Sequence, residues 1–411
     1  MVCFCGKLML PTGLIDACLS LEGELISGIA KSMKGCESVD FILPGMIDLH
    51  VHMRGLCQKH KGEWRTESLA ALSGGVTVIA DMPNNLPKID NPEALRMKIE
   101  EAKSESFVDF LLYTAYPYVA EDEVVIGVKV YPEDMMRGLK EVFRRASQLG
   151  KEVVVHAEDP ICLMESDSVD DVREHSAARP ELAEVIAVTR VISLARKHGA
   201  KLRIAHATLP STLTAVKEAK AEGVRVSSEV TLHHLLFSTR DAERLGSLFK
   251  VNPPIRSPEI RDKLIRMVEV GYSDFLVTDH APHSPEEKSR SYGDMPSGIP
   301  WLDSLAPFLL QCVEEGSLPY RALLMYSSEP ASHLGLRRGA LIPGNIADLV
   351  ILRREKWVLK REDLHTKAET SPILGKELKW KVDRVILRGE IAYQDGPNVP
   401  MGFGKPAVRS G

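Results

Sequence analysis

The chain has 411 residues, with 52 lysines and arginines against 57 aspartates and glutamates, giving a formal net charge of −5. This balance, without any basic block, excludes a nucleic-acid binder that depends on phosphate contacts, and no stretch approaches the ~18 uninterrupted apolar residues of a membrane-spanning helix. With 44% hydrophobic residues the composition is that of a folded globular protein, large enough for one α/β barrel or two to three smaller domains.

Residues 1–44 are predicted to form short strands separated by glycine and proline turns, as in the fragment 25–30. Residues 338–411 have the same pattern, with strand-like segments at 347–352 and 382–389. We expect the two β-rich ends to meet in one small β-sandwich domain.

The cysteines of the chain are odd in number and scattered, which is a poor disulfide framework. Cys3 and Cys5 form a C-x-C pair. We expect both cysteines to act as small apolar residues on one face of an opening strand, and a metal site is the less favoured alternative. The N-terminus lacks a basic region followed by an apolar one, so no signal peptide is predicted. These features together indicate a cytoplasmic protein.

Residues 45–337 alternate short apolar, β-branched runs with amphipathic helical stretches such as 91–103 and 179–198. The strand-like runs are residues 76–80, 124–130, 152–156, 202–206, 224–228 and 275–278. Strands that alternate with helices predict βαβ units and a parallel sheet. About 290 residues of this pattern suit a (β/α)₈ barrel.

Side chains that can bind metals lie where these strands end. An apolar run ends in the H-x-H pair His50 and His52, whose imidazoles face the same side of a strand and can bind one metal. His156 and His206 end two further strands, and Asp279 follows another. An isolated H-x-H is often incidental, but five such residues at strand ends are hard to explain as satisfied core residues, because barrel enzymes assemble their sites there.

Lys129 lies within the apolar segment G-V-K-V-Y, where burial of an ammonium group is costly. One interpretation is a lysine that reaches the barrel mouth or pairs with an acid. The other is a lysine of lowered pKa that is carboxylated by CO₂ and bridges two metals. The position between ligand-bearing strands favours the second interpretation.

A set of segments in a characteristic order resembles the cyclic amidohydrolases of the amidohydrolase superfamily, and among them the dihydroorotase family. These segments are LPGMIDLHVHMR, GGVTVIADMPNNLP, GVKVY, VHAED, IAHAT, EVTLHH, KVNPPIR and TDHAPHSPEEK. The resemblance implies a distorted (β/α)₈ TIM barrel with a small β domain, two zinc ions, and reversible ring closure of N-carbamoyl-L-aspartate to L-dihydroorotate in pyrimidine biosynthesis.

The resemblance also implies a role for each matching residue. One zinc would be held by His50, His52 and Asp279, the other by His156 and His206, with carboxylated Lys129 and a hydroxide bridging them. Asp279 would accept the proton of the attacking hydroxide and deliver it to the leaving amide nitrogen. The same residue would serve the reverse reaction.

Dihydroorotate carries a carboxylate that ring opening does not use, so a specific enzyme needs a cation for it. Arg54 has the strand parity of His52 and can bind a carboxylate with two hydrogen bonds. The family pattern implies Asn84 and His283 as further contacts and Asn252 as a contact of the ring amides. The alternative roles are a surface charge for Arg54, a turn-forming residue for each asparagine and a loop cap for His283. Packing or supporting roles are expected for His233, His234 and His280.

The sequence departs from the family pattern at two loops, and the identity of the bridging ligand has an alternative. Residues 55–57 replace the usual E-P-G after the arginine, and the substrate-facing loop 284–297 lacks a usual turn. Some relatives have an aspartate in place of the bridging lysine, but Asp134 is a poor substitute for Lys129 here.

Two alternatives of different kinds stay open. Another cyclic amidase, an allantoinase or a dihydropyrimidinase (hydantoinase), would typically lack an arginine at position 54. A non-catalytic scaffold for aspartate transcarbamoylase would have lost ligands, whereas all six are present. A homo-oligomer, and association with aspartate transcarbamoylase alongside activity, are both compatible with the sequence.

Overall fold

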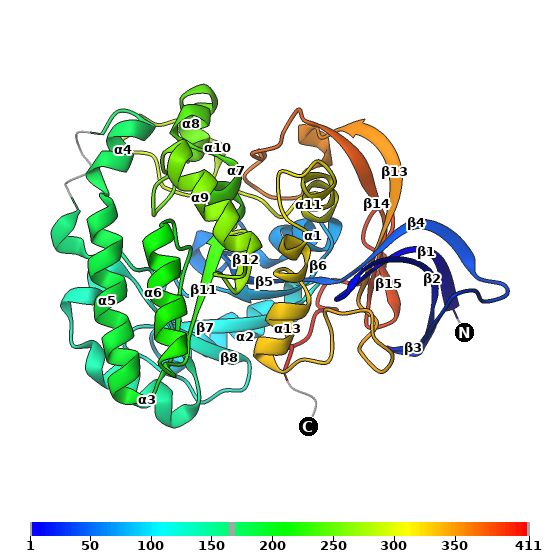
Figure 1. Ribbon diagram of the computed structural model, residues 1–411, viewed down its shortest axis with the longest axis horizontal. Helices are drawn as coiled ribbons and strands as arrows, with labels where there is room; N and C mark the ends of the chain where they lie inside the picture. Colours follow the sequence, from blue (N-terminus) through cyan, green and yellow to red (C-terminus); the bar gives the residue numbers. More distant parts are fainter. Residues whose placement is uncertain (1, 164–168, 409–411) are drawn as a thin grey trace.

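Eight parallel strands form the central sheet, in which each strand is hydrogen-bonded to its neighbour in chain order (Figure 1). The computed structural model describes residues 2–163 and 169–408. The strands are β5 (Met46–Val51), β6 (Val76–Asp81), β7 (Asp109–Ala115), β8 (Val125–Val130), β9 (Glu152–Val155), β10 (Lys201–Ile204), β11 (Val226–Thr231) and β12 (Phe275–Val277). Nearly all of their residues are buried, as expected for a parallel sheet that is covered by helices.

The first and last of these strands close the barrel through individual hydrogen bonds rather than a continuous ladder. The Asp48 carboxylate on β5 accepts hydrogen bonds from the Thr278 hydroxyl at 2.5 Å and from its amide at 3.2 Å. One step further along, the His52 amide donates to the His280 carbonyl at 2.7 Å. The barrel is therefore nearly closed and irregular at one seam, which confirms the predicted distorted (β/α)₈ fold.

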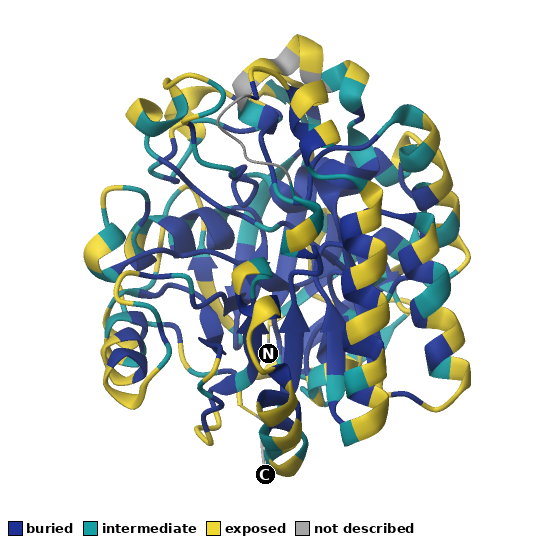
Figure 2. Ribbon diagram, turned by 90° about the vertical axis from the view of Figure 1, so that its left-hand side faces the viewer, coloured by how far each residue is buried: buried dark blue, intermediate teal, exposed yellow. Residues whose placement is uncertain are grey.

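Helices surround the barrel, and most of them have a buried side toward the barrel and an exposed side toward solvent (Figure 2). They are α1 (Trp64–Ser73), α2 (Pro92–Glu105), α3 (Leu139–Leu149), α4 (Val172–Ala178), α5 (Glu181–His198), α6 (Pro210–Ala221), α7 (Leu232–Leu236), α8 (Thr239–Leu245), α9 (Pro258–Glu269), α10 (Pro285–Lys288), α11 (Leu305–Glu314), α12 (Arg321–Leu324) and α13 (Ser328–Leu334). Shorter 3₁₀ turns are η1 (Leu56–Gln58), η2 (Pro132–Met136), η3 (Pro160–Cys162), η5 (Gly246–Phe249) and η6 (Arg361–Asp363). Local sequence determines where several of the helices begin. The side chain of Asn91 caps α2 by accepting a hydrogen bond from the Ala94 amide, and Pro92 occupies the first helical position.

The predicted strands correspond to seven of the eight barrel strands, and the strand that sequence reasoning missed is β7. This strand is fully buried and runs Phe110-Leu111-Leu112-Tyr113 through its centre. A continuous apolar run without β-branched residues has no period that separates a strand from a buried helix. The pattern was therefore uninformative at this one place.

The other strands come from both ends of the chain and form one mixed sheet beside the barrel (Figure 1). Its strands are β1 (Val2–Leu10), β2 (Gly13–Glu22), β3 (Leu25–Ala30), β4 (Glu37–Pro44), β13 (Leu349–Val358), β14 (Glu377–Leu387) and β15 (Glu390–Tyr393), in the spatial order β15-β14-β13-β4-β1-β2-β3. The antiparallel pair β4 and β13 joins the two ends. The predicted small β domain is thus present, as a single hydrogen-bonded sheet rather than two facing ones. Only Gly45 separates β4 from the first barrel strand.

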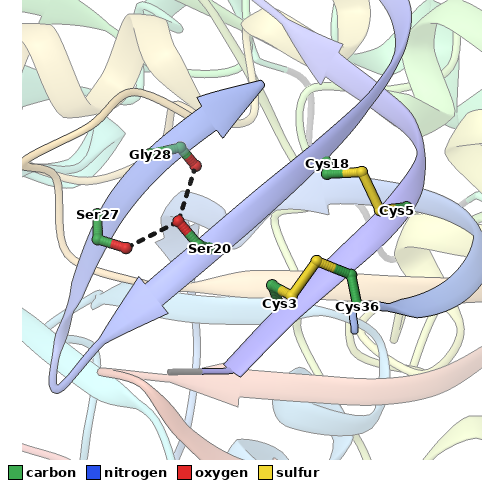
Figure 3. The surroundings of a disulfide bond; sticks show 7 residues. All are labelled: Cys3, Cys5, Cys18, Ser20, Ser27, Gly28 and Cys36. Carbon is green, nitrogen blue, oxygen red and sulfur yellow. Dashed lines mark hydrogen bonds between the residues drawn. A yellow bond between two sulfur atoms is a disulfide. The ribbon is translucent and has the colours of Figure 1, made fainter. Parts of the chain in front are cut away.

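The cysteine prediction is wrong, because the structure contains two disulfides in this sheet. Cys3 is bonded to Cys36, and Cys5 to Cys18 (Figure 3). The partners are 33 and 13 residues apart in the sequence, and it is the pairing of β1 with both β2 and β4 that brings them together. The spacing of the cysteines along the chain does not indicate which of them pair. Across the described ranges, no helix is both long enough and apolar enough to cross a membrane.

Candidate functional site

The carboxyl ends of the barrel strands surround a cavity of about 530 Å³. Nine of the ten residues singled out from the sequence line it: His50, His52, Arg54, Asn84, Lys129, His156, His206, Asn252 and Asp279. The tenth, His283, lies directly behind the wall in contact with Arg54. Residues spread over most of the barrel are thus brought to one place, as expected when strand ends converge.

Four histidines and one aspartate form the floor of this cavity. The Nε2 atoms of His50 and His52 lie 3.3 and 3.0 Å from Oδ1 of Asp279. The His206 ring centroid lies 5.2 Å from that of His50 and 4.4 Å from that of His156. Ligand atoms of His50, His206 and Asp279 all lie within 4.8 Å of one another, a separation that one metal ion could span.

Three of these cavity residues have a backbone conformation that residues other than glycine rarely adopt. The φ angle is 60° at Arg54, 35° at His206 and 50° at Asp279. Each lies just beyond a strand end, where the left-handed conformation turns the chain sharply. Such conformations cost of order 1–3 kcal/mol each and concentrate at functional sites.

Each of three histidines is held from behind by a hydrogen bond to its second ring nitrogen. Nδ1 of His50 donates to the Glu229 carboxylate, and Nδ1 of His52 donates to Oδ1 of Asn84 at 2.6 Å. Nε2 of His156 donates to Glu158 at 2.5 Å. This assignment leaves the other nitrogen of each ring unprotonated, as metal binding requires.

Glu158 is itself held by the guanidinium of Arg179, with Nη2 at 2.5 Å from Oε2 and Nε at 3.1 Å from Oε1. Burial raises the pKa of Glu158, but His156 and Arg179 more than offset this and lower it to about 2. The carboxylate is therefore ionised at neutral pH and orients His156. Its signal in the sequence was its position two residues after His156 in H-A-E-D.

Lys129 lines the same cavity and is almost fully buried, at 1% exposure. Its Nζ has no hydrogen-bond partner among the described residues, and neither does Nδ1 of His206. Burial lowers the pKa of Lys129 to about 8, against the opposing effect of Glu229 and Asp279. An orphaned, partly neutral amine among four histidines fits a lysine that is carboxylated and shared between metals.

Asp279 combines burial with several positive or polar neighbours. Burial raises its pKa, but His50, His52 and Lys129 more than offset this and hold the pKa of Asp279 below its usual range. An ionised carboxylate between two imidazoles can bind a cation and can also accept a proton from a water molecule in the cavity.

Arg54 is buried in the cavity wall and bonds only to neutral groups. Its Nε donates to the Pro282 carbonyl at 3.2 Å and its Nη2 to Nε2 of His283 at 3.1 Å. Among the ion pairs of the described residues, none involves its guanidinium. Burial, together with Arg54 itself, lowers the pKa of His283 to about 3, so that this imidazole is neutral and accepts from Arg54 while Nδ1 donates to Glu287.

The two asparagines have partners of their own as well as a place in the cavity. Asn84 uses its carbonyl oxygen for His52, which leaves its amide group to face the cavity. Asn252 accepts from Nε2 of His175 at 2.9 Å. Contact of either with a substrate stays a prediction.

The loop 284–297, whose sequence departs from the family pattern, is held by hydrogen bonds near both of its ends. Ser284 caps α10, and Nζ of Lys288 donates to the carbonyls of Pro296 and Gly298 at 3.2 Å each. Gly298 has a φ of 149°, and a Cβ there would lie 2.6 Å from the Ala281 carbonyl oxygen. Only glycine fits this position on the cavity wall.

Sequence reasoning missed the supporting residues. Glu229 was visible as an acid inside the buried strand V-S-S-E-V-T, and Tyr131, Glu158, Arg179 and His175 had no assigned role. The three histidines expected to pack do so: His280 bonds to Glu67 at 2.8 Å, His234 to the Pro253 carbonyl at 3.0 Å, and His233 is buried beside His234.

Comparison with known proteins gives a consistent result. Residues 41–392 match the model of the "Amidohydrolase family". A dihydroorotase from Methanothermobacter thermautotrophicus is 32% identical over 399 residues, which cover 91% of this chain and 90% of that protein. A dihydroorotase from Aeropyrum pernix is 34% identical over 396 residues, covering 92% and 91%.

Solved structures with the same architecture include an L-hydantoinase (dihydropyrimidinase) from Arthrobacter aurescens, with a TM-score of 0.89, 25% identity and 98% coverage of both chains. A D-hydantoinase from Thermus sp. has a TM-score of 0.85 at 23% identity over 100% of this chain and 99% of that chain, which shows a shared fold.

Proposed function

This chain belongs to the amidohydrolase family and is a hydrolase that acts on cyclic amides, and from this premise we propose that it is a dihydroorotase. The proposed reaction is the reversible cyclisation of N-carbamoyl-L-aspartate to L-dihydroorotate and water, a step of pyrimidine biosynthesis. The dihydroorotases that it resembles at 32% and 34% identity over most of their length support the assignment.

The observation that carries the proposal is the buried guanidinium of Arg54. An arginine at 6% exposure without an ion-pair partner among the described residues carries a large desolvation cost. A ligand carboxylate in the cavity would remove that cost and could bind in a bidentate manner. Dihydroorotate has such a carboxylate beside its cyclic amide, whereas dihydrouracil and hydantoin rings do not.

The donor set fits a pair of divalent metal ions, which we propose to be zinc. His50, His52 and Asp279 would hold one ion, and His156 and His206 the other, with carboxylated Lys129 shared between them. Unpartnered Lys129 Nζ and His206 Nδ1 support this fit. Bound metals would polarise the scissile carbonyl and lower the pKa of the attacking water.

Asp279 is the proposed general acid and base. Its carboxylate is ionised, lies between two imidazoles and faces the cavity, so it can accept the proton of the attacking water. The same carboxyl group can then deliver that proton to the ring nitrogen as the C–N bond breaks. Without this delivery the leaving group would be an amide anion. In ring closure, Asp279 removes the proton from the attacking carbamoyl nitrogen.

The second candidate function is that of a hydantoinase or dihydropyrimidinase, because the L-hydantoinase from Arthrobacter aurescens has a TM-score of 0.89 to this chain. Allantoinase is a third member of the same group of cyclic amidases. All three would use the same floor of the cavity and differ in the groups that surround the ring. Arg54 favours the substrate with a carboxylate.

The scaffold alternative predicts missing ligands, whereas all six proposed ligands line one cavity. Association with aspartate transcarbamoylase and formation of a homo-oligomer are both compatible with activity.

The decisive experiment is a substrate comparison with the purified, metal-loaded chain. Ring opening of L-dihydroorotate, hydantoin, dihydrouracil and allantoin should be measured side by side, together with metal content. We expect turnover of dihydroorotate at a kcat/KM at least about 100-fold above the others. Faster turnover of hydantoin or dihydrouracil would replace this assignment with the second candidate.

A further inference from the structure

Four cysteines lie together on the small sheet, away from the barrel cavity. Cys3 and Cys5 are two residues apart on β1 and therefore face the same side. Cys18 on β2 is directly opposite Cys5, and Cys36 immediately precedes β4, where Glu37 pairs with Phe4. Three neighbouring strands thus bring four sulfur atoms to one face (Figure 3).

These sulfur atoms form one cluster and not merely two separate bonds. The Sγ atoms of Cys5, Cys18 and Cys36 all lie within 4.8 Å of one another, and Cys3 is bonded to Cys36. Four sulfurs around a zinc ion with Zn–S bonds of ~2.3 Å are ~3.8 Å apart. Side-chain rotation after the two S–S bonds are broken could therefore bring all four to tetrahedral positions.

The residue opposite Cys3 adds no free donor atom to the four sulfur atoms. The residue opposite Cys3 on β2 is Ser20, whose hydroxyl is already hydrogen-bonded to Ser27 at 2.8 Å (Figure 3). Cys18 is buried, whereas Cys3, Cys5 and Cys36 are partly exposed, so that a reductant and an ion can reach the cluster. The remaining cysteines, Cys57, Cys162 and Cys312, lie on other elements.

We propose that this cluster is a redox-dependent metal site: two disulfides when oxidised, and a four-thiolate site for one thiophilic divalent cation of the zinc class when reduced. Each S–S bond is reduced to two thiols by two electrons and two protons: two thiols supply both and become a disulfide, or a phosphine supplies the electrons and becomes the phosphine oxide while water supplies the protons. When the four thiols bind the ion as thiolates, four protons are released. Soft thiolate ligands in tetrahedral geometry select such ions.

Cobalt(II) is the probe, because tetrahedral cobalt bound by thiolates gives an intense sulfur-to-metal charge-transfer absorption. Ligands in the barrel cavity are nitrogen and oxygen atoms and give no such band. The full-length protein is reduced anaerobically with a phosphine, freed of excess reductant and titrated with Co²⁺. We expect the plateau intensity of the band to correspond to one sulfur-bound cobalt ion per chain, and we expect the band to be absent from the oxidised protein and to disappear when Zn²⁺ is added.

Matched variants locate the site. Cys5→Ser/Cys36→Ser removes one partner of each disulfide and should abolish the band, whereas Cys57→Ser/Cys162→Ser should retain it. Absence of the band from the reduced wild type, or its persistence in Cys5→Ser/Cys36→Ser, would overturn the proposal. If that variant does not fold, the oxidised and reduced wild-type proteins still decide the question. The readout is independent of ring-opening activity, so the proposed function and this inference can fail separately.

Discussion

Glu229 holds the imidazole of His50 from the side opposite Asp279: Nδ1 of His50 donates to the Glu229 carboxylate, while Nε2 lies 3.3 Å from Oδ1 of Asp279. The other oxygen of Glu229 lies 3.4 Å from Nη1 of Arg203, and Nε of Arg203 lies 3.2 Å from Glu152. The orientation of one proposed metal ligand is thereby connected to a chain of charges inside the barrel.

Glu229→Gln should weaken metal binding above pH ~7, because burial raises the pKa of Glu229 to about 7 and a neutral amide accepts a weaker hydrogen bond from His50 than the ionised carboxylate does. Loss of such a supporting group typically lowers metal affinity about 10- to 100-fold. Competition with a chelator measures the change. Asp303→Asn is the matched control, since Asp303 is also a buried acid but accepts hydrogen bonds from the amides of His365 and Thr366 and does not line the cavity. Equal metal affinity in Glu229→Gln and wild type would remove Glu229 from this role.

Lys129→Ala should lose the metal pair and most of the activity, roughly 10³-fold in kcat, since bound metals supply several kcal/mol of transition-state stabilisation. Short carboxylic acids added to the assay should restore part of the rate by taking the place of the bridge. Metal analysis and intact mass report on the bridge directly. Lys88→Ala is the control, because Lys88 lies over the same Tyr131 ring, 5.6 Å from its centroid, as Lys129 does at 5.7 Å. Full metal content and rate in Lys129→Ala would contradict the carboxylated bridge.

Arg54→Met should raise KM for dihydroorotate roughly 10- to 100-fold, the value of a hydrogen bond to a charged group, with a smaller effect on kcat. Exposed Arg65 provides the control variant, Arg65→Met. Metal content should stay at the wild-type level, since Arg54 is not among the proposed ligands. An unchanged KM would show that the substrate carboxylate lies elsewhere.

Glu152 should make stability depend on pH in the acid range. Burial raises its pKa, but Arg203 and His333 more than offset this and lower it from 4.5 to about 2. A lowered carboxyl pKa in the folded state contributes stability above pH ~4.5, of order 3 kcal/mol, and loses it as the pH falls toward ~2.

Chemical denaturation at several pH values checks this linkage. The difference in unfolding free energy between wild type and Glu152→Gln should be largest above pH ~5 and shrink toward pH ~2. Exposed Glu218→Gln should show little such trend. A difference that does not change with pH would mean that Glu152 contributes through packing alone.

The sequence predicted the barrel and the strand ends at which the candidate site residues meet, because both depend on local patterns. Apolar strands that end in His50, His52, His156 or His206 are visible as short runs, and the rule that strand ends converge brings them together. β7 was missed because its apolar run has no period. The strands on either side of β7 were still recognised, because each has a pattern of its own.

What the sequence could not show depends on contacts between distant segments. The partner of Cys3 is Cys36 because β1 pairs with β4, and the partner of His50 is Glu229 because closure of the barrel leaves only β12 between β5 and β11. Neither pairing is encoded in spacing. The strained φ angles at Arg54 and Asp279 are likewise properties of the turn after a strand and not of residue type.

The pairing of β4 with β13 sets an order of events for a chain made from its N-terminus. β4 ends at Pro44 and is synthesised early, but its partner begins at Leu349, after the whole barrel has been made. Until then β4 presents an unpaired side, which is a template for another strand. Ribosome products that stop before residue 349 should therefore aggregate through β4 even when they contain every proposed catalytic and metal-binding residue.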